Sequence, residues 1–306
     1  MKINFFTTPP LTSRLFTTLV AALFLLTGCM TGDDSKTTEY KLSFSANGGT
    51  GEMESITKEE NEKINLPAVK FSRTGFEFLN WNTVADGSGT SYTDGAEFTF
   101  NTDTTLYAQW TVAAENAVNA INSLPTGEHK IAVTGQMTKD NLNGVIAAIK
   151  GNSNGAKVYL DLGGTAIDFD DWQRCKFADC ENLIGIVIPA IESPDKNNPI
   201  ILIPDLMFEG CKNLKSVIIL NSSGEYKIIT FKDCTSLEYV EIPTSIVCIY
   251  SDAFDGCTAL GTITYKGTVE QWKQVKTDYK NSKYKLMSLD VQCENGTASG
   301  SDLIKE

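Results

Sequence analysis

Histidine is nearly absent from this 306-residue chain, which contains only His129. One imidazole rules out metal sites built from several histidines and removes most histidine-based catalysis. His129 follows Gly127 and Glu128 in a predicted turn, where a solvated loop residue is expected. The sequence also lacks a nucleophile elbow, a P-loop and a dinucleotide fingerprint. We therefore expect a protein that is not an enzyme and that holds no cofactor and no metal.

Positive charge is also scarce, because 26 Lys and Arg stand against 38 Asp and Glu, for a net charge of -12. Removal of residues 1–28, which carry Lys2 and Arg14 and no acid, takes the net charge to -14. A nucleic-acid-binding protein needs a basic face to meet phosphates, so no nucleic-acid partner is expected. The acidity is typical of a soluble, self-repelling surface on a folded protein with 42% hydrophobic residues.

The apolar run at the N-terminus, Leu15 to Leu26, is too short to span a bilayer and has the length of a signal-peptide core. It ends in Leu26-Thr27-Gly28-Cys29, which resembles the bacterial lipobox. The resemblance implies cleavage after residue 28, lipidation of Cys29 and a membrane anchor, followed by a polar tether over residues 29–39. The alternative is an ordinary secretory signal with a chance cysteine; either way the protein is exported.

Residues 40–111 alternate short strand patterns with glycine-rich turns at Asn47–Gly51 and Asp86–Thr90. The segments Phe44–Gly49, Arg73–Phe78 and Thr105–Trp110 resemble the internalin B-repeat, or Listeria-Bacteroides repeat, of bacterial surface proteins. The resemblance implies a small β-grasp (ubiquitin-like) module, a mixed sheet packed on a short helix or an irregular crossover. Its expected core residues are Phe44, Phe76, Phe78, Trp81, Phe98, Leu106 and Trp110.

A linker over residues 112–129, with a helix from Ala113 to Leu124, is expected to join this module to an α/β cap at residues 130–176. The cap combines a strand at Lys130–Val133, an amphipathic helix at Met137–Lys150 and a strand at Lys157–Leu162. It would cover the first apolar coil of the region that begins at Phe177.

One pattern recurs four times between Phe177 and Tyr265: Phe-x-x-Cys-x-x-Leu-x-x-[Ile/Val]-x-[Ile/Tyr]. Its cysteines stand at Cys180, Cys211, Cys234 and Cys257. Successive cysteines are 31, 23 and 23 residues apart. A repeat length between 20 and 50 residues predicts a solenoid, whose units bury their apolar faces only by stacking. In the third unit, Lys227–Thr230 departs from the pattern and predicts a shifted register.

These repeats resemble leucine-rich repeats of the BspA type, with the best match at Ile246, Ile249, Ala253, Phe254, Cys257 and Leu260. We expect the repeats at residues 177–267 and a C-terminal cap and tail at 268–306, in which Trp272 covers the last coil. The fold class is therefore multidomain and mostly β with some α: a β-grasp module plus a short solenoid with an α/β cap.

The four repeated cysteines would form a ladder with one thiol in each unit, whereas zinc ligands surround one point. They are expected to be small buried residues, and the pairing of Cys175, Cys248 and Cys293 stays open. Asp168, Asp170 and Asp171 lack the glycine and distal glutamate of a calcium loop and are expected to cap the following turn.

Function is then expected on a surface. In each repeat strand the residues beside the buried Val or Ile point away from the core, which predicts columns with apolar Val187 and Ile218 beside Tyr239. This candidate partner-contact face consists of Val187, Ile218, Tyr239, Glu241, Thr262 and Thr264.

The favoured hypothesis is a lipoprotein of the cell envelope, on the outer surface rather than in the periplasm, that displays modules for contact with a protein partner. Similar proteins include adhesins. The alternatives are a carbohydrate-binding envelope protein that uses exposed Trp or Tyr, and a structural spacer without a specific ligand.

Overall fold

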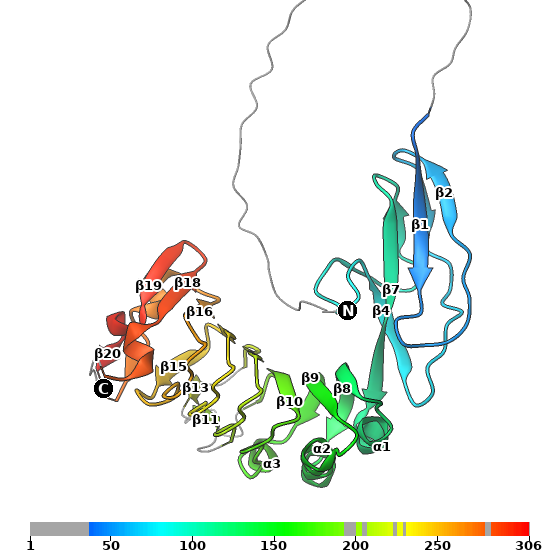
Figure 1. Ribbon diagram of the computed structural model, residues 1–306. Coiled ribbons are helices and arrows are strands. Elements are labelled where there is room, and N and C mark those ends of the chain that lie inside the picture. The colour runs from blue at the N-terminus through cyan, green and yellow to red at the C-terminus, as the bar shows by residue number, and fades with distance from the viewer. Residues whose placement is uncertain are drawn as a thin grey trace, which may run out of the picture. The chain divides into compact units, whose positions relative to one another are not determined.

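The computed structural model describes residues 37–192, 200–203, 207–222, 225–228, 231–278 and 283–305 (Figure 1). The expected signal peptide, Cys29 and most of the expected tether lie outside the described residues. The chain divides into two compact units. The first contains Glu52–Lys70 and Asn80–Ala108, and the second contains Gly48–Gly51, Phe71–Leu79 and Gln109–Glu306.

The part of the chain between residues 39 and 113 is built from short strands. They are β1 (Glu39–Ser45), β2 (Ile56–Glu59), β3 (Lys63–Asn65), β4 (Glu77–Asn82), β5 (Ser91–Tyr92), β6 (Glu97–Thr99) and β7 (Thr104–Ala113). β1 pairs antiparallel with β2 and parallel with β7, so the sheet is mixed as expected. Of the two crossovers expected, a short helix or an irregular segment, the structure has the irregular one, because residues 37–113 contain no helix. Trp81, Phe98, Leu106 and Trp110 are buried as predicted, while Phe44, Phe76 and Phe78 are only half-buried.

The segment after β7 differs from the prediction of a helix starting at Ala113. The strand continues through Ala113, because Thr111–Ala113 pair with Ala132–Thr134 of β8 (Gly127–Met137). A 3-10 turn η1 (Ala114–Asn116) and a short helix α1 (Ala117–Asn122) then follow. Strand pairing outweighs the helix propensity of the alanines here, as tertiary context commonly does.

The predicted strand, helix and strand are confirmed in type, although both strands are longer than predicted. Between β8 and β9 (Ala156–Ile167), α2 (Lys139–Gly151) begins after Thr138, whose side chain accepts a hydrogen bond from the Asn141 amide. Its buried face includes the predicted Leu142, Val145, Ile146 and Ile149. The two strands pair in parallel over almost their whole length.

The repeats continue this sheet in sequence order, as Figure 1 shows. Parallel strands β10 (Leu183–Ile188), β12 (Ser216–Ile219), β14 (Tyr239–Ile242), β16 (Thr262–Tyr265) and β18 (Asp290–Cys293) follow β9, and β19 (Gly296–Ser299) closes the edge antiparallel to β18. A second parallel sheet contains β11 (Ile200–Ile203), β13 (Glu225–Ile228), β15 (Ile246–Ile249), β17 (Lys276–Thr277) and β20 (Ile304–Lys305). The predicted irregularity of the third repeat is confirmed by a register shift at Tyr226/Lys227.

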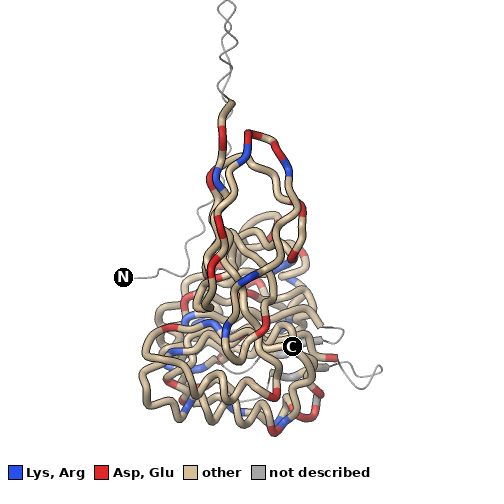
Figure 2. Tube along the Cα trace, turned by 90° about the vertical axis from the view of Figure 1, so that its right-hand side faces the viewer, with Lys and Arg blue, Asp and Glu red and all other residues tan. Residues whose placement is uncertain are grey.

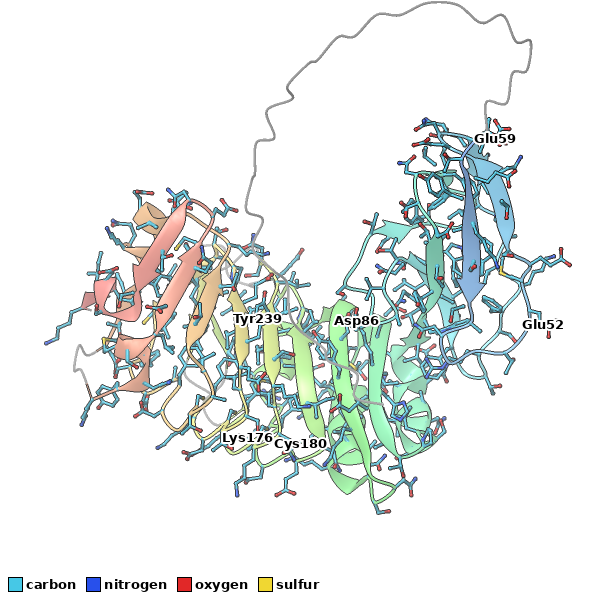
Figure 3. All side chains as sticks on the ribbon, turned by 45° about the horizontal axis from the view of Figure 1, so that its top comes forward. Glu52, Glu59, Asp86, Lys176, Cys180 and Tyr239 are labelled. Carbon is cyan, nitrogen blue, oxygen red and sulfur yellow. The ribbon has the colours of Figure 1, made fainter. Side chains whose placement is uncertain are left out.

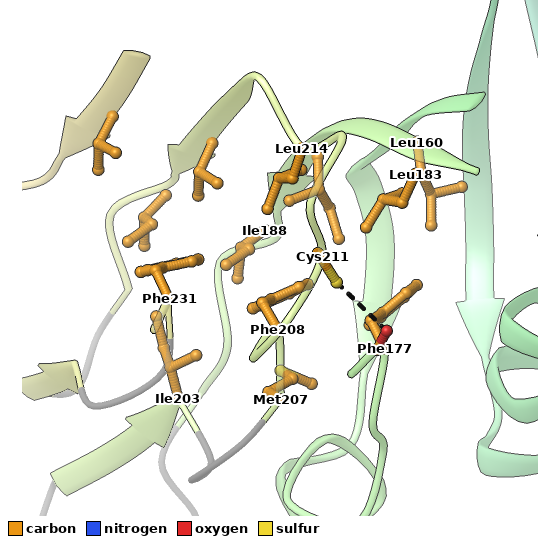
Figure 4. Close-up of a cluster of buried hydrophobic side chains, with 14 of the residues drawn as sticks. Leu160, Phe177, Leu183, Ile188, Ile203, Met207, Phe208, Cys211, Leu214 and Phe231 are labelled. Carbon is orange, nitrogen blue, oxygen red and sulfur yellow. Dashed lines mark hydrogen bonds between the residues drawn. The ribbon is translucent and has the colours of Figure 1, made fainter. Parts of the chain in front are cut away.

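The repeated phenylalanines stack inside the core between the two sheets (Figure 4). Phe177, Phe208, Phe231 and Phe254 are fully buried, with successive ring centroids 5.3, 5.4 and 5.7 Å apart and nearly parallel planes. The four repeated cysteines are buried beside them, as predicted. The stack supplies much of the apolar burial that one unit cannot provide alone.

The turn before each repeated cysteine needs a left-handed residue. Asp179, Gly210, Asp233 and Gly256 occupy this position with φ of 57°, 71°, 59° and 76°. A side chain on Gly210 would overlap the Asp179 carboxylate, and one on Gly256 would overlap that of Asp233. Aspartate in one repeat therefore requires glycine in the next.

The C-terminal part is more ordered than the predicted cap and tail. α4 (Val269–Trp272) begins at a capping box of Thr268 and Gln271, and Trp272 is fully buried, with its indole N–H donating to the Ser299 carbonyl over 2.9 Å. Trp272 does not end the core, because β17, β18 and β20 each add a further strand to the sheets. Short helices α3 (Phe169–Trp172), η2 (Lys285–Ser288) and η3 (Gly300–Asp302) complete the described elements.

Candidate partner-contact face

The candidate site is the face of the long sheet that points away from the Phe stack. Along each strand the inward residues, such as Ile186, Val217 and Val240, belong to the buried core, and their neighbours lie on the opposite face. Parallel pairing brings those neighbours into rows that run across the strands.

Strand register defines two rows on this face. The first row contains Lys130, Tyr159, Gly185, Ser216 and Tyr239. The second row contains Ala132, Asp161, Val187, Ile218, Glu241 and Thr264. The expected column of Val187, Ile218 and Tyr239 is therefore wrong in one respect: Val187 and Ile218 align with Glu241, because Tyr239 lies two residues earlier in β14.

The six predicted face residues differ in exposure. Thr262 is exposed, whereas Ile218, Tyr239, Glu241 and Thr264 are half-buried. Val187 is only 8% exposed, which is less than expected of a contact residue. Gly163 and Leu220 are its neighbours on this face, since a Cβ added to Gly163 would lie 3.5 Å from Val187 Cγ1 and 3.2 Å from Leu220 Cδ1.

The side chain of Tyr239, which Figure 3 labels, is held by a residue of the second row. Its phenol donates to Glu241 Oε2 over 2.8 Å, and Lys266 Nζ lies 3.1 Å from the same oxygen. Burial, together with the hydrogen bond to the Glu241 carboxylate, raises the pKa of Tyr239 to about 12. The ring is thus fixed on the sheet, with its hydroxyl protonated throughout the physiological range.

Tyr159 and Asp161 of β9 belong to the same face and were missed from the sequence. Burial raises the pKa of Tyr159 well above its ordinary value, and the Asp161 charge adds to this effect. The available signal was the alternation in Lys157–Leu162, which places Tyr159 and Asp161 opposite the apolar Val158 and Leu160. Assigning that strand to a cap concealed its continuity with the repeats.

Gly185 explains where the Tyr159 ring lies. A Cβ on Gly185 would overlap Cδ2 of that ring and would lie 2.8 Å from Ser216 Oγ. The tyrosine of β9 therefore crosses β10 at the one strand position without a side chain and reaches β12. The two tyrosines of the first row are separated only by a glycine and a serine.

Three ion pairs involve charged residues on or beside the face. Lys130 Nζ lies 3.5 Å from Asp161, Lys266 Nζ lies 3.1 Å from Glu241, and Lys215 Nζ lies 2.8 Å from Glu128. Figure 2 shows acidic and basic residues interspersed along the described chain. The carboxylates are the more covered partners, with Asp161 24% and Glu241 17% exposed.

The other candidate groups have structural contacts. Asp168 accepts from the Asp170 amide as the expected turn cap, and Asp171 accepts from the Lys139 amide at the start of α2. His129 Nε2 lies 2.8 Å from the Pro125 carbonyl oxygen. In the described part of the chain, Cys175, Cys248 and Cys293 are unbridged and no group of three or more His, Cys, Asp or Glu could hold a metal. No helix among the described residues is long and apolar enough to cross a membrane.

Comparison with known proteins identified two regions. Residues 40–109 match the family model of the Listeria-Bacteroides repeat domain. Residues 172–276 match the BspA type leucine-rich repeat region, with six copies. No curated protein and no solved structure matched the chain.

Proposed function

We propose that this chain, which contains a Listeria-Bacteroides repeat domain followed by BspA type leucine-rich repeats, is a lipid-anchored envelope protein that binds a protein partner through its repeat face. The first domain forms a β-grasp module and the repeats form a solenoid. The chain acts by recognition and not by catalysis, in keeping with the absence of nucleophile and phosphate-binding motifs from its sequence.

The arrangement around Tyr239 carries the proposal. Tyr239 is fixed by Glu241, and the half-buried Ile218 of the adjacent strand pairs in register with Glu241, diagonally across from Tyr239. A tyrosine whose rotamer is already restrained loses little entropy on binding, and large aromatic side chains dominate protein–protein contact energies. Stacked repeats commonly use such sheet surfaces for binding.

Lipidation of Cys29 would anchor the exported protein, and with it this face, on the outer side of the membrane that it has crossed. The lipobox-like Leu26–Cys29 supports it, and the acyl chains would hold the protein durably, since each buried CH2 contributes about 0.8 kcal/mol. Display on the outer surface, where a partner on another cell or matrix is accessible, completes the proposal.

The test uses cells that display the full-length chain and a panel of immobilised extracellular-matrix proteins, with a glycan array in parallel. Tyr239→Ala combined with Ile218→Ser should weaken binding to the captured matrix protein by about tenfold or more. The matched control applies comparable changes at the second sheet, with Val247→Ser in β15 and Tyr250→Ala directly after it. Both of those residues are also half-buried, and the control should bind like the unsubstituted chain.

Three results would contradict the proposal. Equal binding by the face variant and the control would exclude the repeat face. Competition by soluble glycans with the face variant unaffected would favour a carbohydrate-binding protein. Absence of saturable binding to either array would favour a spacer.

A further inference from the structure

Two tyrosines from different sequence contexts form a single surface on the long sheet. Tyr159 comes from β9, before the first repeat, and Tyr239 comes from β14. Between them, the first row contains only Gly185 and Ser216, both of which are buried. Burial raises the pKa of Tyr159, and the charges of Asp161 and of Glu241, which accepts from Tyr239, add to this effect.

This arrangement depends on the missing side chain of Gly185. Its backbone φ is not left-handed, so glycine is not required there by conformation. It is required by space, because any Cβ would overlap the Tyr159 ring and crowd Ser216. The displaced group would be a flexible aromatic side chain on a solvent-facing sheet, which can swing out without unfolding the strand.

The chemistry of the surface favours an uncharged partner. Asp161 and Glu241 belong to the second row, and each already has a lysine partner, Lys130 and Lys266. Between the two carboxylates lie Val187 and Ile218, and Leu220 lies beside Val187 over Gly163. A cationic ligand group would have to compete with Lys130 or Lys266 for these carboxylates, whereas an apolar side chain can pack on Ile218 next to the row of the two phenols.

We propose that Tyr159 and Tyr239 together bind an uncharged, apolar peptide segment of a protein partner, and that Gly185 is the positioning residue that lays Tyr159 on this surface. This inference rests on the proposed function of the face. It assigns to the binding site a strand that precedes the family-matched repeats at residues 172–276. It also makes one glycine a determinant of specificity.

The experiment selects binders from a phage-displayed library of random linear peptides against the purified full chain. The selected peptides should be rich in apolar and aromatic residues and carry little net charge. Because Asp161 and Glu241 are already paired with lysines, the affinity of the selected peptides should change less than about twofold between low and physiological salt. Tyr159→Ala and Gly185→Ala should each weaken binding by about tenfold or more. Gly261→Ala is the matched control, since an added Cβ there meets nothing within 4 Å.

A second readout reports the position of Tyr159 directly. Spectrophotometric titration of the phenols should show one tyrosine shifted toward its ordinary pKa in Gly185→Ala, and that difference should be absent when Tyr159→Phe is added. A role confined to fold stability would leave the phenol titration of the folded chain unchanged.

The outcomes separate the inference from the proposed function. An unchanged titration in Gly185→Ala overturns the positioning role. Selection of basic peptides overturns the assignment of an uncharged partner. Normal binding by Tyr159→Ala with loss in the Tyr239→Ala, Ile218→Ser variant excludes Tyr159 but leaves the proposed face intact. Normal binding of the selected peptides by all of these variants overturns both the inference and the proposed function. So does a selection in which no peptide is enriched on the unsubstituted chain relative to the Tyr239→Ala, Ile218→Ser variant.

Discussion

The thiol of Cys234 donates a hydrogen bond to the carbonyl oxygen of Phe208, one repeat earlier, over 3.0 Å. The same carbonyl accepts from the Cys211 amide within its own turn. Cys211 and Cys257 donate in the same way to Phe177 and Phe231, over 3.3 and 2.9 Å (Figure 4 shows the first). The repeated cysteine is therefore both a small core residue and a connection between successive repeats.

Replacing Cys234 tests this connection. Cys234→Ala should lower the free energy of unfolding by about 1–2 kcal/mol, because a small cavity opens and the weak hydrogen bond is lost. Urea denaturation of the purified chain measures the change. Cys293→Ala should cost less, since its thiol lies 3.8 Å from its acceptor at the end of the array. An equal loss at both positions would contradict a linking role for the ladder.

The buried thiols also predict an alkaline loss of stability. Burial raises the pKa of Cys211 and of Cys257 to about 12, and that of Cys175 to about 11. Unfolded thiols have a pKa of about 8.5, so the folded state holds these protons more tightly and is stabilised by them at neutral pH. That stabilisation should be lost as pH rises from about 8.5 toward 12.

Thermal unfolding midpoints across this alkaline range provide the measurement. The combined Cys211→Ala, Cys257→Ala variant is the control, and its midpoint should decline less steeply with pH. Parallel curves for the two proteins would show that other groups, such as the tyrosines, cause the decline.

The alternation of aspartate and glycine in the turns predicts a coupled pair. Gly210→Ala should destabilise the chain by about 1–3 kcal/mol, because alanine is strained at φ 71° and its Cβ meets the Asp179 carboxylate. Adding Asp179→Gly removes the clash and should recover part of the loss. A double-mutant cycle by urea denaturation measures the coupling, and strict additivity of the two changes would contradict the steric account.

The anchor has an independent test. Cys29→Ala should move the protein from the membrane fraction to the soluble fraction of the producing cell, because the acylated sulfur is lost. Immunoblotting of the separated fractions measures this. Persistent membrane association of the variant would contradict lipidation at Cys29.

The structural features that the sequence predicted best are those set by the repeat pattern. The spacing of Phe, Cys and Leu located the buried residues, the strand after each leucine and the outward position of Tyr239, since each depends on local periodicity. The capped helix α2 was also predictable, because Thr138 and the apolar spacing of Leu142 and Val145 mark it.

Properties that depend on pairing partners were not predictable. β7 continues through Ala113 only because β8 is beside it, and the strands after Trp272 form because the sheet edges offer partners. Tyr159 was missed for the same reason, since its position depends on Gly185, 26 residues further along the chain. Local propensity does not depend on such distant neighbours and therefore cannot predict them.

The central claim is that the face of Tyr239 and Ile218 contacts a protein, and site-specific photocrosslinking tests it most directly. A benzoylphenylalanine replaces Ile218 in the displayed full-length chain, or replaces Val247 on the second sheet as the control, and the cells are irradiated on the immobilised matrix protein that they bind. We predict a covalent adduct from position 218 and none from position 247. An adduct from position 247 with none from position 218 would contradict the account.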